Sequence, residues 1–254
     1  MAEDIIKTAL ERFKLCEDAE YRLRQKGLDD DRFYAGEQWD SRVKLDRETG
    51  NNPRPCLTIN LLPQKVKQVT NDARQNMPAI KIAPIEDSDK EVAEVFEGMV
   101  RHIDVASDSA VAYDTALESA VRKGWGFFRV VTEYEDDESF NQVIRIRPIK
   151  NAFTVYVDPT ATRHDYSDAR FMFITQDLRR EELSADQISE FGVETAGDRT
   201  PSWATKDTVR IAEYWTVEEQ EVTLYLLQDG TVTDKLVDGM PYVNERKTTR
   251  KKVI

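Results

Sequence analysis

The sequence has 254 residues, of which 33% are charged, 40% hydrophobic and 9% aromatic, and its formal net charge is −12. This composition excludes a disordered chain, which would be poorer in aromatic residues, and the length allows one large domain or two smaller ones. No apolar run approaches the roughly 18 residues of a membrane span. The acidic start of the chain is unlike a secretory signal, so we expect a soluble protein that stays in a cytoplasm.

The charge balance limits the nucleic-acid functions that the sequence supports. Affinity for duplex DNA comes largely from cationic side chains that displace counterions, so the negative net charge works against tight binding. The same charge is compatible with a protein that encloses DNA and lets it slide, and equally with ordinary acidic solubility.

Cysteine and histidine are too few and too scattered for most catalytic sites. Cys16 and Cys56 form no CxxC pair, and His102 and His164 stand far apart, with His102 expected on a helix surface. No GxxxxGK, GxGxxG, GxSxG or HExxH motif is present. We predict that the chain is not an enzyme and has no catalytic, cofactor-binding or metal-binding residues. Because acidic residues are abundant, a carboxylate metal site of the nuclease kind stays open as an alternative.

The first helix is expected over residues 2–26. Its apolar side chains recur at helical spacing, and Gly27 is placed to cap its C-terminus. Residues 29–31 are three aspartates, which we interpret as the solvated start of a further helix and not as a metal site. The apolar positions of the first helix are Ile5, Ile6, Ala9, Leu10, Phe13, Cys16, Ala19 and Leu23.

A second helix is predicted after a loop that ends near residue 55. Asn60 is placed to cap it and Pro63 suits its first turn. Its polar surface is rich in amides and cations. That surface is either solvated or hydrogen-bonds to a neighbouring subunit or to phosphates. Its narrow apolar stripe consists of Leu62, Val66, Val69 and Ala73.

Residues 79–84 alternate as a short strand after Pro78, and Ser88 with Glu91 forms a capping box for the next helix. That helix has the clearest periodicity in the chain, and residues 107–109 are expected to interrupt it. A further helix then ends at Gly124. The periodic apolar positions are Val92, Val95, Phe96, Met99, Val100 and Ile103.

The residues after Gly124 predict a β-hairpin. The strands are expected over residues 127–134 and 143–149, and the acidic residues between them form a solvated loop. Trp125, Phe127 and Phe128 are the expected packing anchors at the junction of helix and sheet.

The remaining sequence is rich in strand signals. We expect strands at residues 153–157 and 171–174, then a short helix capped by Asp177 and a loop over residues 192–206. Residues 208–216 and 221–228 are predicted to form a second hairpin, followed by a turn at Gly230. The basic residues 246–254 suggest an edge strand, or alternatively a phosphate contact, and they end as if cut off.

These elements predict an α+β fold, with a helical N-terminal half and a β-hairpin-rich C-terminal half. Residues 1–124 form a mainly helical segment. Residues 125–254 form a mainly β segment with one short helix.

Several motifs resemble, in order and spacing, the P22-like phage portal proteins. None is a catalytic fingerprint, and the resemblance rests on their colinearity from about residue 30 to about residue 217. The motifs are FYAGEQW (33–39), RPCLTIN (54–60), NDARQN (71–76), GWG (124–126), VVTEYED (130–136), NQVIR (141–145), SDAR (167–170) and DTVRIAEY (207–214).

This resemblance implies a structural protein of the virion, assembled in the host bacterial cytoplasm. It implies a dodecameric ring at one capsid vertex that docks terminase and contacts capsid or scaffolding and tail-adaptor proteins. Double-stranded DNA passes through without sequence-specific binding, and no membrane is involved. Family members are much longer, so the chain corresponds to an N-terminal, wing-like fragment.

Two other functions stay open on the residues alone. One is a metal-dependent phage nuclease that uses Asp and Glu ligands, and the other is an acidic adaptor that binds a basic partner.

Overall fold

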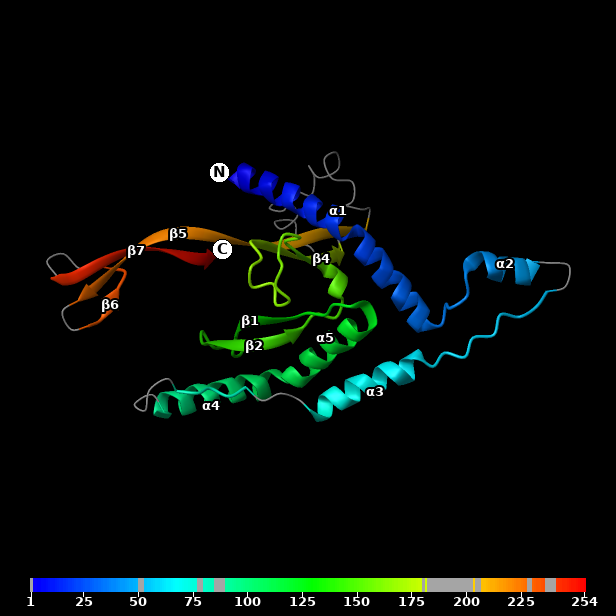
Figure 1. Cartoon of the computed structure of the whole chain (residues 1–254), viewed down its shortest axis with the longest axis horizontal. Coiled ribbons are helices and arrows are strands. Elements are labelled where there is room, and N and C mark those ends of the chain that lie inside the picture. Colours follow the sequence, from blue (N-terminus) through cyan, green and yellow to red (C-terminus); the bar gives the residue numbers. More distant parts are fainter. Residues whose placement is uncertain are drawn as a thin grey trace. The chain divides into compact units, whose positions relative to one another are not determined.

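The computed structural model describes residues 2–49, 53–76, 80–84, 90–179, 181, 203, 207–227, 230–235 and 241–254 (Figure 1). Within these residues five α-helices come first and two β-sheets follow, which confirms the α+β class. The chain forms two compact units, Met1–Glu20 with Thr154–Ile254, and Tyr21–Phe153.

The helices are α1 (Ala2–Ala35), α2 (Ser41–Thr49), α3 (Leu62–Gln75), α4 (Lys90–Ser107) and α5 (Ser109–Lys123). None of those among the described residues is both long enough and apolar enough to cross a membrane. The predicted strand at residues 79–84 is wrong for residues 80–84, which form no regular structure. Pro78, Ser88 and the helix expected after residue 181 lie outside the described residues.

Helix α1 does not end at Gly27, as the sequence predicts. Gly27 is buried, and a Cβ at this position would lie 2.7 Å from the Trp125 ring and 3.2 Å from the Phe153 ring. The glycine therefore gives two aromatic rings access to the helix backbone. The helix ends instead at Gly36, whose φ of +108° suits a residue without a side chain.

The two breaks predicted around α5 are confirmed. Asp108, with a φ of +50°, separates α4 from α5. Gly124 ends α5 with a φ of +92°, and its N–H donates to the Ala120 carbonyl at 2.8 Å. Asn60 lies one residue before the N-cap of α3, but its side-chain oxygen still accepts from the Leu62 N–H at 3.2 Å.

The first hairpin is also confirmed. Strand β1 (Phe128–Tyr134) pairs antiparallel with β2 (Gln142–Pro148), so that Phe128 lies opposite Pro148 and Tyr134 opposite Gln142. Ile146 is the buried residue of the pair, and β2 contacts both α4 and α5. Arg147 donates from Nε to the Glu133 carboxylate at 2.9 Å across the strands.

The second sheet consists of β3 (Val155–Val157), β4 (Phe171–Arg179), β5 (Thr208–Leu227), β6 (Val232–Thr233) and β7 (Tyr242–Val253). The strand order is β3-β4-β5-β6, and β7 also pairs with β5. The first half of α1 packs on this sheet through Phe13 and Cys16, which are both buried. Phe13 meets Tyr156 and Phe173 at ring-centroid distances of 4.6 and 5.4 Å. This aromatic cluster is the core of the unit.

The predicted hairpin of residues 208–228 is wrong, because β5 is one continuous strand. Its first half pairs with β4 and its second half with β7. Residues 217–220 contain no glycine, proline, asparagine or aspartate to form a turn. Instead, Glu218 and Glu219 lie opposite Lys252 and Lys251, so the charges of the expected turn are paired across strands.

Two further features concern the ends of this sheet. Asp177 caps no helix but lies on β4, where its carboxylate accepts from Arg210 Nε at 2.7 Å. Gly230, with a φ of +85°, lies in the predicted turn between β5 and β6. Within the described residues β7 pairs with β5 alone, which confirms the edge strand.

The loop between β3 and β4 is held by two aspartates. The buried Asp158 carboxylate accepts from the N–H groups of Thr160 and Arg170. Asp168 accepts from the Thr162 N–H at 2.8 Å and from its hydroxyl at 2.9 Å. These bonds favour the carboxylate form and lower the pKa of Asp168 from 3.8 to about 2.

Replacing Gly126 by alanine is expected to destabilise the second unit. A Cβ at Gly126 would lie 1.8 Å from the Ala116 carbonyl oxygen, so the backbone must move, at a cost of about 1–3 kcal/mol. The matched control is Gly98→Ala in α4, where no atom lies within 4 Å of the new Cβ. This change should stabilise the helix by about 0.5–1 kcal/mol. Urea unfolding measures both, and equal effects would contradict the prediction.

Asp168→Asn is expected to lose more stability at neutral pH than at low pH. The folded-state pKa lies below the ordinary value, so the carboxylate contributes stability above about pH 4, and this is lost as pH falls through about 2. The difference between the variant and the unmodified chain should therefore shrink between pH 5 and pH 2.5. Urea unfolding at both pH values measures it, and a constant difference would disprove the assignment.

Candidate interaction surfaces

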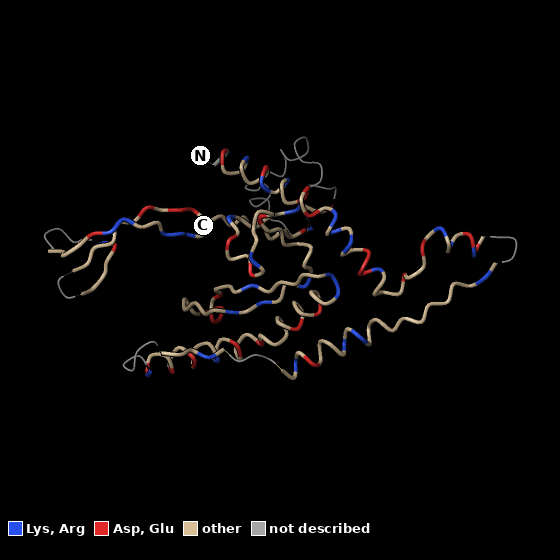
Figure 2. Tube along the Cα trace, in the orientation of Figure 1, with Lys and Arg blue, Asp and Glu red and all other residues tan. Residues whose placement is uncertain are grey.

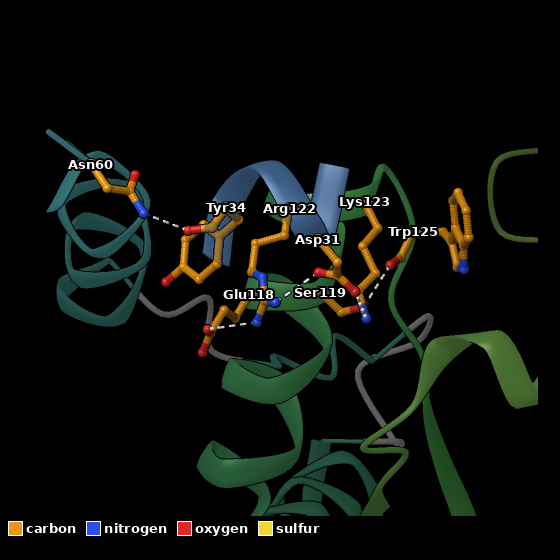
Figure 3. Close-up of polar contacts among 8 residues, drawn as sticks. All are labelled: Asp31, Tyr34, Asn60, Glu118, Ser119, Arg122, Lys123 and Trp125. Atoms are coloured by element: carbon orange, nitrogen blue, oxygen red, sulfur yellow. Dashed lines mark hydrogen bonds and ion pairs between the residues drawn. The ribbon is translucent and has the colours of Figure 1, made fainter. Parts of the chain in front are cut away.

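A polar junction within the unit Tyr21–Phe153 joins the second half of α1 to the end of α5 (Figure 3). The Asp31 carboxylate accepts from Arg122 Nη2 at 2.7 Å and forms an ion pair with Lys123 Nζ at 3.0 Å. Arg122 also reaches Glu118 at 3.4 Å, and its guanidinium lies 4.2 Å from the centre of the Tyr34 ring. The side chain of Lys123 is only 10% exposed, so Asp31 neutralises an almost buried ammonium group.

The aspartate run at residues 29–31 therefore differs from its prediction. It lies inside α1 and not at a helix start, and only Asp31 faces α5. Asp29 forms an exposed i,i+3 pair with Arg32. The sequence shows the three charges but not the cations that come from residues about 90 positions later.

The same junction orders the chain after α5. Ser119 donates from its hydroxyl to the Trp125 carbonyl at 2.9 Å, and the Trp125 ring meets Phe153 edge-on at 5.4 Å. Of the three predicted anchors, Trp125 thus packs against two other segments. Phe127 is half-buried, whereas Phe128 remains 45% exposed and meets Tyr113 at 5.0 Å.

Asn60 links the end of α1 to the segment that precedes α3. Its side-chain NH₂ donates to the Tyr34 carbonyl at 2.7 Å, and its oxygen accepts from Gln38 at 3.1 Å (Figure 3 shows the bond to Tyr34). Trp39 donates from Nε1 to the Leu57 carbonyl at 3.2 Å. The motifs at residues 33–39 and 54–60 are therefore in direct contact. The sequence does not predict this contact, because no local pattern relates the two motifs.

Four of the six periodic apolar positions of α4 are exposed, contrary to what the strong periodicity suggests, and Val100 and Ile103 are half-buried. Val92, Val95, Phe96 and Met99 are each more than half exposed, whereas the helix buries Ala93 and Ser107 on another side. Large apolar side chains gathered on one surface mark an interaction site more often than a free surface. The sequence predicted the helix correctly, but it did not predict that these side chains are exposed.

A second exposed apolar stripe lies on the extended residues 53–61. Leu57, Ile59 and Leu61 alternate along the segment, and Ile59 is 84% exposed. Alternation along extended backbone places Leu57 and Ile59 on one side, whereas Leu61 is the N-cap of α3 and has helical backbone angles. This period of two is visible in the sequence, but the motif at residues 54–60 does not predict its exposure.

Charge separates along the second sheet, where the acidic part of β5 lies beside the basic β7 (Figure 2). Arg250 of β7 also pairs with Asp234 at 2.8 Å. Three of the five cations of β7, Arg250, Lys251 and Lys252, therefore have carboxylates close by. This pairing supports the edge-strand interpretation of residues 246–254 over a phosphate contact.

Nothing in the described part of the chain brings three or more Asp, Glu, His or Cys side chains together as metal ligands. His102 is exposed on α4, as predicted, and Cys16 and Cys56 are free thiols. The nuclease alternative thus gains no support from these residues.

Asp31→Asn is expected to destabilise the chain by about 1–3 kcal/mol, because it leaves the nearly buried Lys123 ammonium without its carboxylate. The control is Asp29→Asn, two residues earlier in the same helix. Its pair with Arg32 is largely exposed, so its loss should cost less than about 0.5 kcal/mol. Thermal or urea unfolding compares the two, and a larger effect at Asp29 would refute the role of the junction.

Comparison with known proteins agrees with the ordered motifs. Residues 10–254 match the family described as phage P22-like portal protein. A portal protein of Acyrthosiphon pisum secondary endosymbiont phage 1 is 26% identical over 251 residues, which cover 92% of this chain and 35% of that protein. The chain thus spans about a third of the length of this relative. The match extends through both compact units, and the chain belongs to the family of phage P22-like portal proteins.

Proposed function

We propose that the chain is the N-terminal, wing-like part of a portal subunit and acts through its shape and its contacts. The observation that carries this proposal is the family match over residues 10–254. The described surfaces support it, because apolar side chains on α4 and on residues 57–61 are exposed and could pack against a partner. The described residues also contain no group of three or more metal-ligating side chains. A structural role fits such a surface better than catalysis does.

The portal ring is proposed to occupy one vertex of the capsid as a dodecamer. Terminase docks on it and drives double-stranded DNA inward during packaging, and the DNA leaves through it at ejection. Its other partners are capsid or scaffolding and tail-adaptor proteins, and it becomes part of the virion after assembly in the host cytoplasm. The net charge of −12 is compatible with a conduit, since weak phosphate contacts let DNA slide.

The test is the assembly state of the gene product expressed in its natural reading frame. Mass photometry should show a discrete species many times the subunit mass, and electron microscopy should show closed rings. A plasmid-nicking assay with magnesium or manganese serves as the control for the nuclease alternative and should show no cleavage. Monomers at every concentration tested, or cleavage that depends on the metal, would overturn the proposal.

A further inference from the structure

An open cavity of about 950 Å³ lies within the unit Tyr21–Phe153, between the end of α3 and the corner where α4 meets α5. This volume is at the upper end of the range of typical small-molecule sites, roughly 300–1,000 Å³. Most of the surface that lines the cavity is apolar, so it suits a ligand with an apolar body. The larger aliphatic side chains of the lining are Ile80, Val105 and Leu117.

Two aromatic side chains also line the cavity. The rings of Tyr113 and Phe128 meet edge-on, with their centroids 5.0 Å apart. The Tyr113 hydroxyl donates to Asp104 Oδ1 at 3.1 Å, and the pKa of Tyr113 is raised, first by burial and then by the Asp104 carboxylate. The faces of aromatic rings are negative and attract cations. The rings therefore add an apolar contact that tolerates a positive charge.

The charged side chains that line the cavity leave an excess of carboxylates. They are Arg74, Asp104, Asp108 and Asp114. Arg74 Nε forms an ion pair with Asp114 at 2.7 Å, so these two charges compensate each other. Asp104 contacts a neutral hydroxyl, and neither Asp104 nor Asp108 forms an ion pair with any residue that the structure describes. The cavity thus keeps two negative charges and no free cation among its described lining residues.

We propose that this cavity binds a small organic cation, in which an ammonium group is carried on an apolar body. The apolar body packs against the aliphatic and aromatic side chains, and the ammonium group is attracted to Asp104 and Asp108. An anionic ligand of the same shape is repelled by these carboxylates, and a neutral one gains nothing from them. The inference goes beyond the proposed function, because a subunit that acts through its shape needs no small ligand.

Three dansyl probes with different head groups test the preferred charge. Dansylcadaverine carries an ammonium group, dansyl amide is neutral and dansylglycine carries a carboxylate, whereas the fluorescent apolar body is the same in all three. The gene product expressed in its natural reading frame is titrated near neutral pH, and dansyl fluorescence measures binding. Binding should be saturable, tightest for dansylcadaverine and weakest for dansylglycine. No saturable binding of dansylcadaverine, or equal binding of all three probes, would overturn the proposal.

Asp104→Asn tests where the cation binds. The asparagine oxygen still accepts from Tyr113, so the variant keeps the shape of the cavity and loses one charge. It should weaken the binding of dansylcadaverine roughly fivefold and leave that of dansyl amide unchanged. The control is Glu94→Gln, which removes a charge from an exposed position of the same helix outside the cavity lining. An equal loss in both variants would reflect net charge alone and would refute the assignment.

Ala110→Phe tests the cavity independently of its charge. Ala110 lines the cavity and is exposed, so the added ring takes up space that the ligand needs. The variant should weaken dansylcadaverine and dansyl amide to the same degree, whereas Ala106→Phe, exposed but outside the lining, should weaken neither. Unchanged binding to Ala110→Phe would place the probes elsewhere and disprove the site. These assays measure binding and not assembly, so their failure leaves the proposed portal function unaffected.

Discussion

The unit Tyr21–Phe153 depends on the close approach of α1 to the turn that follows α5. Trp125 and Phe153 reach the backbone of α1 at Gly27, and one turn further Asp31 neutralises Arg122 and Lys123. The apolar contact requires a residue without a side chain, and the ion pairs require their partners at a fixed distance. Together they set the direction in which α5 runs and where the hairpin of β1 and β2 begins.

The energetics of this unit leave apolar surface unburied. Four of the periodic side chains of α4 and the alternating ones of residues 53–61 are more than half exposed, although burying a large apolar side chain contributes about 1.5–3 kcal/mol. The unit therefore gains only part of this contribution from them. Covering these side chains with a partner would therefore stabilise a complex.

The other unit contains a long antiparallel pair of strands, formed by the second half of β5 and by β7. No residue in the second half of β5 or in β7 is buried, so the two strands have little core of their own. Their stability comes from backbone pairing and from opposite charges placed across the strands at Glu218–Lys252 and Glu219–Lys251. The lysines on the outer strand also discourage unwanted pairing along its free edge.

The sequence by itself determined the α+β class, the helices α4 and α5 with their break at Asp108, the stop at Gly124 and the first hairpin. These depend on local periodicity and on residues that favour positive φ, which are properties of neighbours in the chain. Only the tertiary structure decided that Gly27 lies inside a helix, that β5 runs straight through residues 217–220, and that Asp31 and Asn60 join distant motifs. Those outcomes depend on aromatic rings, charged side chains and strands that are distant in the sequence. The exposure of the apolar side chains of α4 is likewise decided by which distant segments pack against the helix.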